Sequence, residues 1–71
     1  MKKISVSLSG HQTSISLEDD FIDALHAIAK HDKVSVASII DMIDEKRDPD
    51  SNLSSAVRSY ILRRYMQEAK L

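Results

Sequence analysis

The chain has 71 residues, no cysteine, and a formal net charge of −1 from 10 basic and 11 acidic residues. This length allows one domain whose modest core favours oligomerisation, and the lack of cysteine excludes disulfides and thiolate zinc sites. No apolar run is long enough to cross a membrane and the N-terminal residues lack the long apolar region of a signal peptide, so we expect a cytoplasmic protein without membrane contacts.

The first predicted element is the β segment of residues 1–17. Two stretches, ISVSL at residues 4–8 and TSISL at residues 13–17, alternate apolar residues with serine but with opposite parity. One straight strand would therefore split the apolar side chains between two faces. A hairpin with Gly10 at the first central position of a type II′ turn removes the conflict. It would pair Leu8 with Thr13, Val6 with Ile15, and Ile4 with Leu17. A bulge at Gly10 within one long strand is the alternative.

Residues 18–47 carry the pattern of two amphipathic helices, which form the predicted core helix pair. The acids at residues 18–20 suit the positive end of a helix dipole, and Ser16 with Asp19 resembles a capping box for the first helix. Its apolar stripe, which runs to about His31, is Phe21, Ile22, Leu25, Ile28 and Ala29. Ser35 is the expected N-cap of the second helix, whose stripe is Val36, Ile39, Ile40 and Ile43.

Residues 51–71 are predicted to form a third helix, after turn chemistry around Pro49. Ser51 or Asn52 is the expected N-cap. The apolar face of this helix is Leu53, Val57, Tyr60, Ile61 and Tyr65. Its arginines, together with the N-terminal lysines, flank an acidic middle. A local basic patch attracts phosphate, and the same distribution equally serves solubility and pairing between subunits.

The sequence offers no catalytic or metal-binding motif. Gly10 is the only glycine, so a glycine-rich phosphate loop is excluded. His26 and His31 lie about 140° apart around a helix and do not converge on one ion. The acidic stretch DEKRDPD lacks the spacing and the glycine of an EF-hand loop. We therefore expect neither an enzyme nor a bound metal or cofactor.

Residues 13–43, TSISLEDDFIDALHAIAKHDKVSVASIIDMI, resemble the ribbon-helix-helix fold of Arc/MetJ-type repressors. The leading KKISVSLSGHQTSISLE and trailing DPDSNLSSAVRSYILRRY are similar to a short bacterial subfamily with an extra N-terminal strand and a third helix. The resemblance implies a single, mainly helical α+β domain over residues 1–71 that forms an intertwined homodimer. The implied dimer core is Ile15, Leu17, Phe21, Leu25, Ile28, Ile39, Ile40 and Ile43.

The same resemblance implies a DNA-binding transcriptional regulator that inserts its β-ribbon into the major groove of double-stranded DNA. The base-reading side chains would be Gln12, Ser14 and Ser16. The phosphate contacts would come from Ser35 and the Val36 amide at the start of the second helix. Charge would be supplied by Lys2, Lys3 and Lys33, or by the C-terminal arginines.

Two departures from the family pattern favour an alternative function. The groove-facing strand carries Gln and Ser, whereas the family commonly uses Arg or Lys there. Two hairpins paired in a dimer would also make a four-stranded sheet, and a major groove about 12 Å wide admits a helix or a two-stranded ribbon. The alternative is a ribbon-helix-helix dimer that acts as a protein-interaction or antitoxin-like module, with a protein partner on its third helix.

Overall fold

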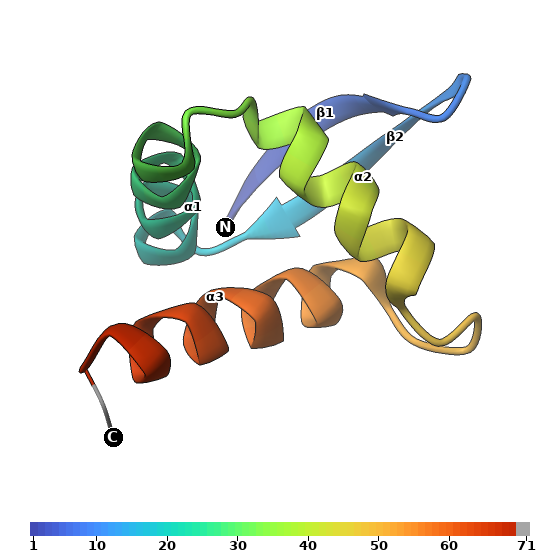
Figure 1. Ribbon diagram of the computed structural model, residues 1–71. Coiled ribbons are helices and arrows are strands. Elements are labelled where there is room, and N and C mark those ends of the chain that lie inside the picture. Colours follow the sequence, from blue (N-terminus) through green and yellow to red (C-terminus); the bar gives the residue numbers. More distant parts are fainter. Residues whose placement is uncertain (70–71) are drawn as a thin grey trace.

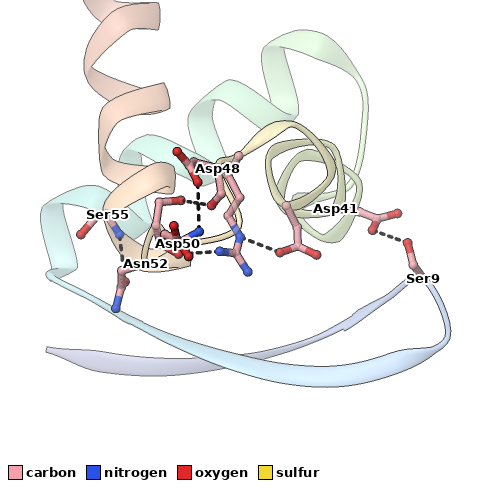
Figure 2. A network of polar contacts seen from close by, with 9 residues as sticks. Ser9, Asp41, Asp48, Asp50, Asn52 and Ser55 are labelled. Atoms are coloured by element: carbon pink, nitrogen blue, oxygen red, sulfur yellow. Dashed lines mark hydrogen bonds and ion pairs between the residues drawn. The ribbon is translucent and has the colours of Figure 1, made fainter.

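The computed structural model describes residues 1–69, which form a two-stranded antiparallel sheet followed by three helices (Figure 1). The helices lie on one face of the hairpin and leave its other face uncovered, as Figure 2 shows. The predicted hairpin and the predicted order of elements are confirmed. The elements are β1 (Lys2–Leu8), β2 (His11–Leu17), α1 (Asp19–Asp32), α2 (Val36–Lys46) and α3 (Leu53–Ala69).

The hairpin turn lies one residue earlier than predicted. Its central residues are Ser9 and Gly10, with φ of +43° and +89°, so the turn is type I′ and not type II′. The predicted register is therefore wrong by two residues, and an even shift leaves every side chain on its predicted face. The observed pairs include Leu8 with His11, Val6 with Thr13, and Ile4 with Ile15.

A hydrogen bond to α2 holds the tip of the hairpin. Type I′ turns match the right-handed twist of paired strands, but they require positive φ at both central residues. Ser9 adopts that conformation although it has a Cβ atom, which strains the backbone. Its hydroxyl donates a hydrogen bond of 2.8 Å to Oδ1 of Asp41 (Figure 2). This contact fixes the turn against the helical layer.

Side-chain caps begin two of the helices as predicted. The Ser35 hydroxyl accepts a hydrogen bond of 3.0 Å from the backbone N–H of Ser38, and Oδ1 of Asn52 accepts one of 3.2 Å from the N–H of Ser55. The predicted capping box of α1 is wrong. Its N-cap is Glu18, whose side chain makes no capping hydrogen bond because Arg58 binds the carboxylate.

Lys33 ends α1 and turns the chain back towards the sheet. It adopts the left-handed conformation, with φ of +60°, and the N–H of Val34 donates to the Ala29 carbonyl at 3.0 Å. This is the hydrogen bond of a Schellman motif, a position that glycine usually fills. A residue with a side chain costs roughly 1–2 kcal/mol in this conformation. The turn allows α2 to lie over β1.

The core lies between the inner face of the hairpin and the three helices. Each of the five elements contributes buried side chains to it. In chain order its buried apolar side chains are Leu8, Ile15, Leu17, Leu25, Ile28, Ala29, Ile39, Ile40, Ile43, Val57 and Ile61.

Candidate nucleic-acid interface

The uncovered face of the hairpin is polar and carries no acid. We name it the outer hairpin face. Within it Gln12 and Ser14 are exposed, Ser16 is half-buried, and residues 1–17 contain no Asp or Glu. The alternation of each strand places the predicted base-reading residues here, beside a lysine. The cross-strand pairs of this face are Lys3 with Ser16, Ser5 with Ser14, and Ser7 with Gln12.

The backbone edge of β2 lies beside this face. The pair Leu8 and His11 closes a two-residue turn and is hydrogen-bonded, so by the antiparallel alternation the backbone groups of Gln12, Ser14 and Ser16 point away from β1. Nη2 of Arg58 lies 3.4 Å from the Ser16 carbonyl and donates to it. Helix α3 therefore covers the Ser16 end of the β2 edge.

The predicted phosphate-binding residues are divided between two layers. Lys2 and Lys3 are exposed on β1, and Lys3 shares the outer hairpin face with the three base-reading candidates. The other three belong to the helical layer that covers the opposite face, with Lys33 at the end of α1 and Ser35 and Val36 at the start of α2. Both Lys33 and Ser35 are exposed, and Val36 is half-buried.

Two arginines of α3 form ion pairs with the ends of α1. Nε of Arg58 lies 2.8 Å from Oε1 of Glu18 at the start of α1. At the other end, Nη1 and Nη2 of Arg64 lie 2.7 and 2.9 Å from the two carboxylate oxygens of Asp32. The Tyr60 hydroxyl accepts a further bond of 2.9 Å from Arg64. These two arginines therefore hold α3 against α1. The basic character of the C-terminal segment alone did not predict this structural role.

The ion pairs change how the two carboxyl groups titrate. Hydrogen bonds from the Arg64 guanidinium, and then from His31, hold the pKa of Asp32 well below its usual range. The hydrogen bond from Arg58 likewise lowers the pKa of Glu18. A carboxyl group whose pKa is lower in the folded chain stabilises the fold while it is ionised.

Asp32→Asn is expected to make the chain less stable at neutral pH, and this loss of stability should shrink steadily as pH falls below the pKa of the unfolded carboxyl group. The Asp32 carboxylate contributes its full stabilisation above the pKa of the unfolded chain, about 4, and loses it as pH falls towards the lower folded pKa. Urea unfolding of both proteins at pH 7 and at a series of pH values below about 4 measures this difference. Asp23→Asn, at an exposed site on the same helix, is the control. A stability difference that stays constant down to the lowest pH at which both proteins fold would contradict the prediction.

The residues predicted to form a dimer core are placed inside one chain. Phe21 is half-buried, and its ring lies 6.0 Å from the guanidinium carbon of Arg58. The others are buried among side chains of the same chain: Ile15, Leu17, Leu25, Ile28, Ile39, Ile40 and Ile43.

Comparison with known proteins identifies the family of the chain. A family model described as ribbon-helix-helix domain matches residues 1–65. No curated protein and no solved structure matches the chain. In the described part of the chain, residues 1–69, none of the helices is long and apolar enough to span a bilayer. The match covers most of the sequence, and the arrangement of the hairpin and the helices agrees with it. The chain therefore belongs to the ribbon-helix-helix domain family.

Proposed function

We propose that the chain is a dimeric DNA-binding protein, a transcriptional regulator that reads the major groove through its outer hairpin face. Ribbon-helix-helix domains generally form dimers and are commonly DNA-binding regulators or antitoxins. The observation that carries the proposal is the outer hairpin face, which is polar, free of acids, and one two-stranded ribbon wide. The proposed activity involves no catalysis, and we place it in the cytoplasm.

The side chains of this face suit base edges. The Gln12 amide can donate to and accept from adenine in a bidentate pair, which is worth about 1–3 kcal/mol of discrimination against the wrong base. The hydroxyls of Ser14 and Ser16 can donate or accept, so they fit several bases. Lys3, on the same face, reaches towards phosphate or a guanine edge. Sequence would be read by hydrogen bonds, while the lysines supply the salt-dependent part of the affinity.

The hairpin also suits the width of the groove. β1 and β2 of one chain already make the two-stranded ribbon that a major groove admits. The docking that we propose inserts one hairpin into each half-site, which avoids a four-stranded sheet in the groove. Lys2 and Lys33 would bind flanking phosphates. The Ser35 hydroxyl and the Val36 amide, at the positive end of α2, would bind another.

Ser14→Glu is expected to abolish binding to double-stranded DNA, because it places a negative charge at the centre of the outer hairpin face. Mobility shift at low salt with a library of duplexes, followed by titration of salt, measures this. The Lys2→Ala, Lys3→Ala double variant should reduce the salt slope by about 0.9 for each phosphate that a lysine no longer neutralises. Ser55→Glu adds the same charge at an exposed site on α3 and should bind as wild type does. If the wild-type chain binds no duplex at low salt, the proposal is wrong.

Helix α3 favours protein interaction as a second candidate function. Its last turns expose Leu62, Tyr65 and Met66, which follow one another at the i, i+3, i+4 spacing of a single helix face. Tyr65 lies four residues after the buried Ile61 and borders the buried face, whereas Leu62 and Met66 point away from Val57 and Ile61. An apolar surface of this kind on a small chain is typical of a protein-binding site.

A further inference from the structure

Helices α2 and α3 enclose a groove of about 530 Å³ with an apolar floor. We name it the α2–α3 groove. Its floor combines Met42 and Ile43 from α2 with Ala56 and Tyr60 from α3. Ile43 is buried, while the other three side chains are half-buried and offer apolar surface to a ligand. A groove between two helices is a common binding site for a third, amphipathic helix.

The walls of the groove are basic. Lys46 on α2 and Arg63 on α3 are both exposed, so each helix contributes one cation to the rim. A third cation, Arg47, also lines the groove and is held by Oδ1 of Asp44 at 2.8 Å. The lining includes the acid Asp48, whose carboxylate accepts a hydrogen bond of 3.0 Å within its own turn (Figure 2). Among residues 1–69, two cations that form no ion pair, Lys46 and Arg63, therefore border the apolar floor.

We propose that the α2–α3 groove binds an acidic amphipathic helix of a partner protein. The apolar side of that helix would cover the floor, and its Asp or Glu residues would pair with Lys46 and Arg63. Met66 extends the apolar strip, because it lies three residues after Arg63 and so faces the same side of α3. This inference rests on the second candidate function and is independent of DNA binding.

Neither a second copy of the chain nor DNA fits the groove as well. If a second copy filled the groove, its most acidic segment, the start of α1, would be the part that pairs with the cations. The apolar side chains Leu25 and Ile28 of that helix are already buried in the core of their own chain. This helix therefore lacks an apolar face to offer. A phosphate backbone would pair with Lys46 and Arg63 but would leave the apolar floor against a charged ligand, at a desolvation cost. A helix with one apolar and one acidic side would cover the apolar floor and pair with both cations of the rim.

The test uses a synthetic amphipathic peptide of about four helical turns, with a leucine stripe flanked by glutamates. Fluorescence anisotropy with the full chain should show binding that weakens as salt rises. Two control peptides should not bind: one with lysine flanks, and one with glutamate flanks and a serine stripe. Lys46→Glu and Arg63→Glu should each weaken binding about fivefold to tenfold. Lys30→Glu, at an exposed site on α1, should leave it unchanged.

Several results would overturn the proposal. One is equal binding of the peptides with glutamate and lysine flanks. Another is that Lys46→Glu and Arg63→Glu both bind the glutamate peptide as wild type does. Self-association that Lys46→Glu removes would assign the groove to a second copy, and loss of duplex binding in Arg63→Glu would assign it to DNA. The Ser14→Glu variant separates the two functions, because it should bind the glutamate peptide as wild type does. Failed peptide binding with intact duplex binding would remove the protein-interaction function alone.

Discussion

Val57→Asp is expected to unfold the chain, whereas Leu62→Asp on the same helix is expected to leave it folded. The Val57 side chain is 0% exposed and belongs to the core, while that of Leu62 is 58% exposed. An ionised carboxylate buried without a partner costs several kcal/mol. The total stability of a chain of this length is roughly 4–10 kcal/mol. The buried charge alone removes most of that stability, and the exposed charge removes almost none.

Far-UV circular dichroism and urea unfolding of the two variants measure the difference. Val57→Ala, which removes the same buried side chain without adding charge, should remain folded with reduced stability. This variant separates the loss of packing from the burial of charge. A folded Val57→Asp variant with the urea resistance of the wild type would contradict the prediction. It would mean that α3 packs through a different face or does not pack against the core.

Ile40→Ala should lower the free energy of unfolding by about 2–5 kcal/mol, the second large effect. Ile40 is 0% exposed and lies in α2, the helix that contacts β1, α1 and α3. Truncation of the side chain leaves a cavity, because packed neighbours relax only in part. In so small a core the loss is a large share of the total stability.

A series of substitutions with graded loss of side-chain volume and burial tests this prediction quantitatively. Ile40→Val removes one methylene and should cost about 0.5–1.5 kcal/mol. Val34→Ala, whose side chain is 45% exposed, should cost less than either. The midpoints of urea unfolding, measured under one set of conditions, should follow that order. A cost for Ile40→Ala no larger than that for Val34→Ala would mean that Ile40 is outside the core.

The elements of this fold could be predicted because each carries its own periodicity. The alternation in residues 4–8 and 13–17 gives strands with one apolar and one serine face, and the stripes of the helices identify their buried sides. The register could not be predicted in the same way, since a shift of two residues leaves both faces unchanged. The turn geometry decides between the two registers, and it includes a hydrogen bond from Ser9 to Asp41, far along the chain.

The candidate sites also differ in how far the sequence alone could predict them. Local alternation was enough to place Gln12, Ser14 and Ser16 on one face, because strand neighbours share a face by rule. The partners of Arg58 and Arg64 were not predictable, since helix packing brings them to Glu18 and Asp32. The α2–α3 groove likewise arises only from the angle at which two helices meet. Sequence patterns describe one element at a time, and sites between elements require the packed chain.

The burial of α3 within its own chain bears on how the protein folds and pairs in the cell. Val57 and Ile61 are buried against side chains of their own chain, so we expect a folding step within one chain, whose rate does not depend on protein concentration. An intertwined dimer must instead fold and associate in one step, which becomes slow when copies are scarce. A chain that folds first can persist at low copy number, and only the later pairing of two folded chains obeys mass action.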